Sequence, residues 1–429
     1  MSDFLTLPEG SFTLDNIRIP AAMIGESGDL VETSLSVADG LVTDTRQEQI
    51  IDLGGAMVMP CPVDMHTHLD KGHIWTRAPN PDGSFMGALE TVSADRAANW
   101  SADDVRARME FSLKCAYAHG TRAIRTHLDS LPPQADISWP VFAELRDIWA
   151  DRINLQACCL TGIDHVPPNG GTEFDHTADI VASTGGVLGV VTYPVDDLRD
   201  RLVTFFEDAG NRGLETDFHV DETGDPSVAT LRMLAQVVLE TGFDKRVVAG
   251  HCCSLAVQDE KDCAETLELV AEAGIHIVSL PMCNLYLQDR NTDPSVQRTP
   301  RWRGITVVHE MRALGIPISF ASDNTRDPFY AYGDMDMLEV MREATRIGHL
   351  DHSSEDWPAS FTATPATTCG FEERRLSAGE PADFIILSAR SWTECFARPQ
   401  SDRIVVRNGR AIDRTLPSYS ELDHRVEPA

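Results

Sequence analysis

The sequence has no Cys-x-x-Cys motif, no cluster of basic residues, and no apolar run near the roughly 20 residues that a membrane-spanning helix needs. Its ten cysteines include the adjacent pairs Cys158-Cys159 and Cys252-Cys253. On buried strands, such pairs are typical of small apolar residues in a reducing compartment. A cysteine-bound zinc cluster and a membrane protein are therefore disfavoured.

Positive charge is also scarce, because 36 Lys and Arg residues stand against 67 Asp and Glu, for a formal net charge of -31. Such a surface repels phosphate backbones and anionic lipid, so we expect neither nucleic acid nor membranes as partners. Residues 1–10 lack the basic stretch and apolar core of a secretory signal, which predicts a cytoplasmic protein. A chain of 429 residues, 42% of them hydrophobic, can bury a large core.

Short β-rich runs alternate with longer helical patterns along the middle of the chain. The predicted helices are 102–119, 139–151, 198–212, 227–241, 256–273, 306–314 and 335–347. Alternation of this kind implies parallel strands joined by right-handed crossovers, closed into a (β/α)8 barrel of the TIM type. An open, doubly wound sheet is the competing fold, although no glycine-rich phosphate turn follows the first strand. The eight predicted strands are Ala56–His66, Thr121–Leu128, Ile153–Leu160, Gly186–Thr192, Glu215–Val220, Arg246–His251, His276–Pro281 and Pro317–Ser322.

The two ends of the chain read differently from the middle. Residues 11–55 alternate polar and apolar side chains, as half-buried antiparallel strands do, and residues 382–387 and 403–410 repeat the pattern. We expect the two ends to pair into one small β-sandwich domain. The predicted domains are residues 1–56 plus 370–429 for the β domain and 57–369 for the barrel.

Two histidines one residue apart, His66 and His68, close the first predicted barrel strand. Side chains two residues apart on a strand point the same way, so both rings can bind one metal ion. Catalytic groups in such barrels project from the carboxyl ends of the strands. Metal-binding or acid–base residues follow four other strands: His127 and Asp129, His219 and Glu222, His251, and Asp323 with Asn324.

The fourth strand ends in Thr192-Tyr193-Pro194 and offers neither lysine nor glutamate to bridge two metals, so one metal is expected. Three histidines and an aspartate leave a divalent ion with net positive charge, which lowers the pKa of a bound water from about 15.7 to about 7. Glu222 is placed to shuttle a proton, and His251 to orient or deprotonate the water. Asp323 is placed to accept the proton of that water.

Each residue taken singly has a simpler explanation. His219 or His251 alone is more often a hydrogen-bonded histidine at a strand end, and Asp323 alone is more often a helix cap. His127 and Asp129 fit a supporting role as well as a direct one. Their joint occurrence at the strand ends is what favours a metal site.

Seven motifs extend this pattern over nearly the whole chain, and together they resemble the amidohydrolase superfamily, within it the cytosine deaminase branch. The resemblance implies one iron or zinc ion held by His66, His68, His219 and Asp323, with Glu222 and His251 as proton-transfer residues. The motifs are residues 62–70, 125–127, 218–222, 250–251, 284–288, 303–306 and 323–328, with marks of the small β domain at 381–384 and 406–409.

The reaction implied by the resemblance is hydrolytic loss of ammonia from a small amino-substituted heterocycle. Metal hydroxide attacks the ring carbon that bears the amine, helped by His251 and Asp323. Glu222 protonates the neighbouring ring nitrogen. The adduct then expels ammonia and leaves a carbonyl. The superfamily also makes a homo-oligomer plausible, and His₃Asp suits iron and zinc equally.

Several residues depart from the cytosine deaminase pattern. No glutamine follows Gln156 to read a pyrimidine edge, Phe329 stands where tryptophan is usual, and Asn324 replaces a second aspartate. A site that lacks the side chain that hydrogen-bonds the edge of the ring is expected to accept a different substrate. Lys71, which resembles a position in aminohydrolases of s-triazine rings, and Arg326 bring cations near the predicted mouth.

With Asn324 and Phe329, these two cations are the predicted substrate contacts. They suggest a more oxygen-rich or partly anionic ring than cytosine. In the alternative, Lys71 and Arg326 pair with Asp70 and Asp327. Two other functions stay open at this point: ring-opening hydrolysis of a cyclic amide, and a non-catalytic barrel that serves as a binding protein.

Overall fold

The computed structural model describes residues 4–291 and 295–426. The chain divides into two compact units. Unit 1 comprises Met1–Asp64, Leu113–Ala123 and Met335–Ser418, and unit 2 comprises Met65–Ser112, Ile124–Asp334 and Tyr419–Ala429. None of the described helices is both long and apolar enough to cross a bilayer. The domain boundaries predicted at residues 56/57 and 369/370 stay a prediction.

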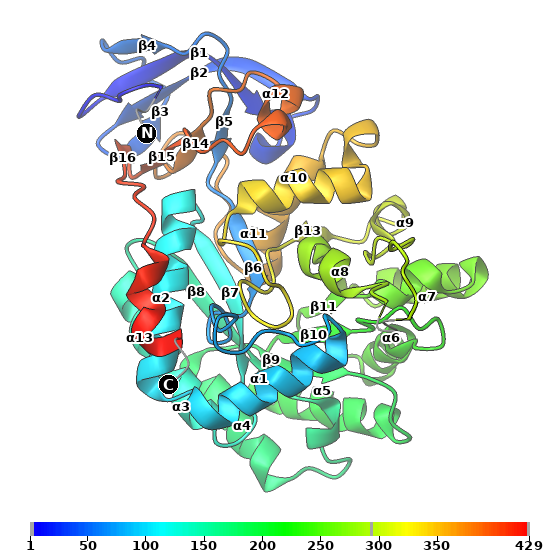
Figure 1. Cartoon of the computed structure of the whole chain (residues 1–429). Coiled ribbons are helices and arrows are strands. Elements are labelled where there is room, and N and C mark those ends of the chain that lie inside the picture. Colours follow the sequence, from blue (N-terminus) through cyan, green and yellow to red (C-terminus); the bar gives the residue numbers. More distant parts are fainter. Residues whose placement is uncertain (1–3, 292–294, 427–429) are drawn as a thin grey trace. The chain divides into compact units, whose positions relative to one another are not determined.

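Parallel strands, most of them labelled in Figure 1, pair with one another in a closed ring. One sheet has the order β6-β7-β8, and the other runs β9 to β13 in chain order. Parallel bridges Cys158–Val187 and Gly162–Val191 join β8 to β9, and the bridge Thr67–Asp323 joins β6 to the end of β13. The predicted (β/α)8 barrel is therefore confirmed. Its strands are β6 (Val63–Thr67), β7 (Ala123–Asp129), β8 (Asn154–Leu160), β9 (Leu188–Thr192), β10 (Thr216–Val220), β11 (Val247–His251), β12 (His276–Ser279) and β13 (Ile318–Phe320).

Helices follow the barrel strands, and those from α3 to α7 pack on one another in chain order. Helices α2 and α5 have the predicted bounds, whereas α1, α4 and α8 have no counterpart among the predicted helices. The helices of this part are α1 (Phe85–Asn99), α2 (Ala102–His119), α3 (Ala135–Trp149), α4 (Thr172–Thr184), α5 (Leu198–Arg212), α6 (Thr230–Thr241), α7 (Glu260–Glu272), α8 (Pro281–Leu287), α9 (Val308–Ala313) and the short α13 (Asp423–Val426).

Helix α5 shows how the sequence dictates this packing. Leu202, Phe205 and Ala209 recur at three- and four-residue spacing, so they share one face, and all are buried. The Phe205 ring lies 4.9 Å from the ring of Phe218 on β10, between centroids. The helix ends at Gly213, whose φ of +67° is left-handed backbone that glycine adopts without strain.

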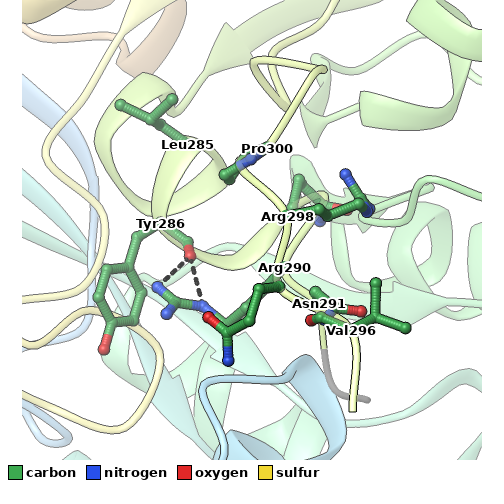
Figure 2. A pocket seen from close by; sticks show the side chains of 9 residues that line it. Leu285, Tyr286, Arg290, Asn291, Val296, Arg298 and Pro300 are labelled. Carbon is green, nitrogen blue, oxygen red and sulfur yellow. Dashed lines mark hydrogen bonds between the residues drawn. The ribbon is translucent and has the colours of Figure 1, made fainter. Parts of the chain in front are cut away.

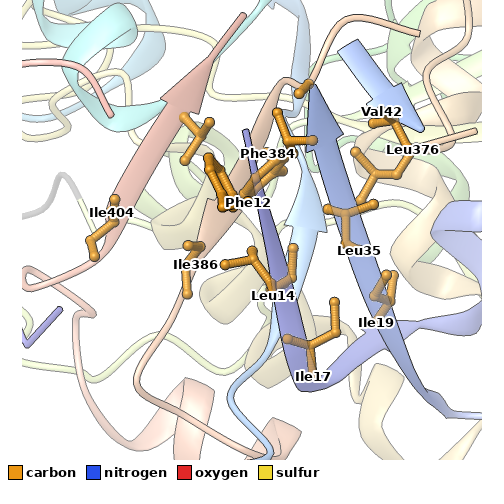
Figure 3. Close-up of a cluster of buried hydrophobic side chains, with 14 residues drawn as sticks. Phe12, Leu14, Ile17, Ile19, Leu35, Val42, Leu376, Phe384, Ile386 and Ile404 are labelled. Carbon is orange, nitrogen blue, oxygen red and sulfur yellow. The ribbon is translucent and has the colours of Figure 1, made fainter. Parts of the chain in front are cut away.

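Unit 1 contains a β-sandwich built from both ends of the chain, as predicted. One sheet has the order β3-β2-β1-β4 and the other β16-β15-β14-β5. Apolar side chains from both sheets, including Phe12, Leu35, Phe384 and Ile404, form a buried cluster between them (Figure 3). The strands are β1 (Phe12–Pro20), β2 (Leu30–Ala38), β3 (Leu41–Thr43), β4 (Ile50–Asp52), β5 (Val58–Pro60), β14 (Phe384–Ile386), β15 (Ile404–Arg407) and β16 (Arg410–Ala411), and the helices are α10 (Met337–Gly348), α11 (Ala363–Cys369) and α12 (Trp392–Ala397).

The predicted first barrel strand, Ala56–His66, is wrong in one respect, because it is two strands. β5 pairs antiparallel with β14 in the sandwich, and β6 begins only at Val63. Pro60 and Pro62 lack the N–H that a continuous ladder needs, so the chain changes sheets between them.

Candidate active site

Three imidazoles and one carboxylate converge at the carboxyl ends of β6, β10 and β13. His66 Nε2 lies 3.1 Å from His219 Nε2, which lies 3.4 Å from His68 Nε2. Asp323 Oδ1 lies 3.7 Å from His66 Nε2 and 3.2 Å from His68 Nε2. All four side chains are buried.

These four groups fit a divalent metal ion. Around a tetrahedral ion with bonds of about 2.0–2.1 Å, ligand atoms stand roughly 3.4 Å apart, which matches the spacing found here. Burial holds the pKa of His66, His68 and His219 well below the ordinary value, so the rings are neutral. Neutral imidazole nitrogens converging with a carboxylate form a donor set suited to zinc or iron.

The backbone turns sharply where these side chains leave the strands. Asp221, His251 and Asp323 have φ values of +50°, +67° and +63°, all left-handed. Such conformations cost non-glycine residues about 1–3 kcal/mol and persist where the surrounding structure enforces them. For Asp221, part of that enforcement comes from the carboxylate, which accepts hydrogen bonds from the backbone N–H groups of Thr230 and Leu231 at the start of α6.

Glu222 and His251, the predicted proton-transfer residues, lie together beside the four groups. Glu222 Oε1 is 3.3 Å from His251 Nδ1. Burial, followed by the charge of Asp323, raises the pKa of Glu222 well above its ordinary value. A carboxyl group in that condition retains a proton that it can deliver.

Asn284 joins this pair, and sequence reasoning did not assign it a role. Its Nδ2 donates to Glu222 Oε1 at 3.2 Å and lies 3.0 Å from His251 Nδ1. The available signal was its place in the motif 284–288, directly after the seventh barrel strand. Nothing in that motif shows which side chain faces the carboxylate.

Lys71 is buried, and its ion pair is made with Asp129 rather than with Asp70. Nζ lies 3.4 Å from Asp129 Oδ1 and 5.1 Å from the centroid of the Phe329 ring. Burial lowers the pKa of Lys71, but neighbouring carboxylates, Asp129 first, outweigh it and raise the pKa, so the ammonium keeps its charge. Asp129 also pairs with Arg96 at 2.7 Å.

The segment after β13 forms a tight turn around Asp327. Its carboxylate accepts from Asn324 Nδ2 at 2.8 Å and from the backbone N–H of Phe329 at 2.8 Å. Among the described contacts, Arg326 makes no ion pair with Asp327. Its guanidinium lies 4.3 Å from the ring centroid of Tyr419 instead. No described hydrogen bond or ion pair joins Arg326 to the histidine cluster.

His127 lies next to the cluster, with its ring centroid 4.0 Å from that of His66. Its Nε2 is 3.9 Å from Asp217 Oδ2. Asp217 is held by Arg125 at 2.9 Å, and Arg125 in turn donates to Gln156 Oε1 at 2.7 Å. Gln156 therefore supports a buried charge pair inside the barrel.

A cavity of about 330 Å³ opens beside helix α8 (Figure 2). Arg290, one of its lining residues, donates from Nε and Nη2 to the carbonyl of Tyr286, at 3.1 and 2.7 Å. Gln288 on its wall also donates to the backbone carbonyl of Glu222, at 3.4 Å. The cavity is lined by Leu285, Tyr286, Gln288, Arg290, Asn291, Val296, Gln297, Arg298 and Pro300.

Comparison with known proteins identifies the family. Residues 169–413 match the model of the Amidohydrolase family. The chain is 51% identical to a pterin deaminase of Rhizobium rhizogenes (strain K84 / ATCC BAA-868), over 98% of each chain. The chain belongs to the amidohydrolase family. It is also 22% identical to the N-isopropylammelide isopropyl amidohydrolase of Pseudomonas sp. (strain ADP), over 91% of this chain and 93% of that protein.

A solved amidohydrolase structure has the same fold. The 5-methylcytosine deaminase of Klebsiella pneumoniae, liganded with 5-fluorocytosine, superposes with a TM-score of 0.76, at 24% identity, over 94% of this chain and 97% of that one. The resemblance read from the sequence is thus confirmed at the level of the family.

Proposed function

We propose that this amidohydrolase is a metal-dependent hydrolytic deaminase, and that its substrate is a pterin. The observation that carries the reaction class is the convergence of His66, His68, His219 and Asp323 beside the Glu222–His251 pair. The substrate rests on the 51% identity to a pterin deaminase over 98% of each chain. The likeness to 5-methylcytosine deaminase, at 24% identity, supports the fold alone.

In the proposed reaction, water adds to the ring carbon that bears the exocyclic amine, the C–N bond breaks, and ammonia leaves a carbonyl behind. The three histidines and Asp323 would hold the divalent ion, which would supply Lewis acidity for the activation of water at neutral pH. Glu222 carries a proton at the start and gives it to the ring nitrogen beside the attacked carbon. That transfer makes the carbon more electrophilic.

Two of the residues predicted to contact the substrate would bind different parts of the pterin, its planar ring and its oxo group. Phe329, packed edge-on against Phe85 with centroids 5.5 Å apart, offers an apolar surface to a planar ring. Lys71 beside it offers a positive charge to an oxo group, which a pterin has. Asn324 holds the turn that carries Phe329. For Arg326, the stacking on Tyr419 favours a structural role over substrate contact.

The test is ammonia release by the purified protein, loaded with zinc or with iron, from pterin, cytosine, guanine and an amino-s-triazine. We expect release from pterin, with an oxo group replacing the amine in the product by mass spectrometry. Release from cytosine or the triazine instead would overturn the substrate. No release from any ring by metal-replete protein would overturn the reaction class. The same preparations decide between the two metals.

A further inference from the structure

We propose that the carboxamide of Asn284 fixes the tautomer of His251, so that this ring presents an N–H rather than a lone pair to the histidine cluster. Asn284 is then a positioning residue that acts through His251 and Glu222. The catalytic role of Asn284 in this inference rests on the proposed deaminase function. The hydrogen bonds and the tautomer of His251 do not depend on that function.

The backbone of Asn284 is held rigidly. Its N–H donates to the carbonyl of Leu280 at 3.0 Å, and its carbonyl accepts from the N–H of Gln288 at 2.9 Å. Gly304, with a φ of +77°, packs against that carbonyl so closely that a Cβ there would lie 2.4 Å from the oxygen. Asn284 is itself completely buried, so its side chain has little freedom to leave its two partners.

The side-chain nitrogen of Asn284 closes a triangle with two acceptors. Nδ2 has two hydrogens and lies 3.2 Å from Glu222 Oε1 and 3.0 Å from His251 Nδ1. Glu222 Oε1 can accept from Nδ2 while the proton of that carboxyl group sits on Oε2, whereas a carboxamide turned the other way would give up this bond and place its oxygen against Oε1. Each hydrogen therefore has one acceptor, and His251 Nδ1 receives one of them.

The proton on His251 follows from this bond. A neutral imidazole has one N–H and one lone pair, so when Nδ1 accepts, the hydrogen resides on Nε2. That Nε2 is buried and has no hydrogen-bond partner within residues 4–291 and 295–426. His66, His219 and His251 each bring one nitrogen within 4.8 Å of the other two. Because Nε2 has no other acceptor among the described residues, its N–H is available to the reacting groups.

This tautomer narrows the role of His251. The sequence left open whether this residue orients or deprotonates the attacking water. A ring that presents N–H can donate to an oxygen atom and hold it in place, but it cannot take a proton from it. Because Glu222 already carries a proton, the base that receives the water proton must then be the carboxylate of Asp323.

The direct test is the histidine ¹⁵N NMR spectrum of the zinc-loaded protein, with the His251 signals assigned by their loss in His251→Asn. In the wild type we expect a protonated Nε2 and an unprotonated Nδ1. Asn284→Asp has nearly the same shape but no N–H to donate, so its carboxylate should draw the hydrogen to Nδ1. Asn154→Asp makes the same chemical change at an exposed position and should leave the spectrum as in the wild type.

Two spectra would overturn the proposal: a wild type with Nδ1 protonated, or Asn284→Asp with Nε2 still protonated. If the aspartate variant does not bind zinc, Asn284→Ala is measured in the same way and should lose the uniform Nε2–H form. These outcomes need no turnover, so they are separate from the fate of the proposed function.

A double-mutant cycle then tests the catalytic consequence. Asn284→Asp should lower kcat by about 100-fold in the wild-type background, in the range for losing one aimed donor. In the His251→Asn background it should cost clearly less, because the ring that Asn284 positions is gone and only its bond to Glu222 remains to be lost. Equal losses in both backgrounds would contradict an action through His251. A general folding defect would show as lost zinc and a lower Tm.

Discussion

The Nε2 atoms of His66 and His219 lie 3.1 Å apart, although 153 residues separate them in the chain. This separation is close to that of two ligand atoms on one tetrahedral ion, and the carboxylate Oδ1 of Asp323 lies 3.7 Å from His66 Nε2. The barrel brings the two rings together because β6 and β10 present their carboxyl ends at the same rim. A bound cation should therefore stabilise the folded protein as well as serve its chemistry.

We predict that a chelator lowers the Tm and abolishes ammonia release, and that zinc or iron restores both. An ion present at 100 times its Kd stabilises the folded state by about 2.7 kcal/mol. His219→Asn should lower both the metal content and the Tm. His176→Gln, at an exposed helix position, is the matched control and should change neither. A chelated protein with an unchanged Tm would argue against a metal centre at this rim.

Replacing the carboxyl group of Glu222 by an amide should separate binding from catalysis. Glu222→Gln keeps the side-chain shape but carries no transferable proton, so kcat should fall by about 10²- to 10⁴-fold with the metal content unchanged. Glu240→Gln, at an exposed position on α6, should retain full turnover. A kcat of Glu222→Gln equal to that of the wild type would show that Glu222 does not transfer the proton.

The barrel and the four converging groups were predictable from the sequence for one physical reason. Parallel strands place all their carboxyl ends at one rim, so residues after separate strands must meet. Helix α1 was not predictable, because its buried face consists of Gly87, Ala88, Val92 and Asp95, which give almost no apolar periodicity. The partner of Lys71 was also hidden, since the adjacent Asp70 is closer in sequence than Asp129 on the next strand.

Lys71 offers a test of the substrate side of the site. Lys71→Met keeps nearly the length of the side chain and removes its charge. A hydrogen bond to a charged group contributes about 1.5–3 kcal/mol. If the ammonium binds an oxo group, KM for pterin should therefore rise by at least about 10-fold. Asp129 retains Arg96 as a partner, which should limit the loss of stability. Lys245→Met, at an exposed position, is the control. A lower Tm with unchanged KM would indicate that Lys71 only neutralises Asp129.

The ion pair between Asp336 and Arg403 should make unit 1 sensitive to acid. Arg403 Nη2 lies 2.6 Å from Asp336 Oδ2, and the guanidinium is buried. Burial alone would raise the pKa of Asp336, but Arg403 and then His119 outweigh it and hold the pKa below its ordinary value. A lowered pKa stabilises the folded state fully above the unfolded pKa of about 3.9, and the stabilisation is lost as the pH falls from there through the lower pKa of the folded state.

Asp336→Asn should therefore destabilise the protein by about 3–5 kcal/mol at pH 7, because it leaves a buried guanidinium without its charge partner. The difference from the wild type, taken from urea unfolding, should shrink as the pH is lowered from 5 to about 3.5. Asp351→Asn removes an exposed carboxylate and should match the wild type at every pH. A difference that stays constant with pH would show that the Asp336 carboxyl group titrates in the folded state as it does in the unfolded chain.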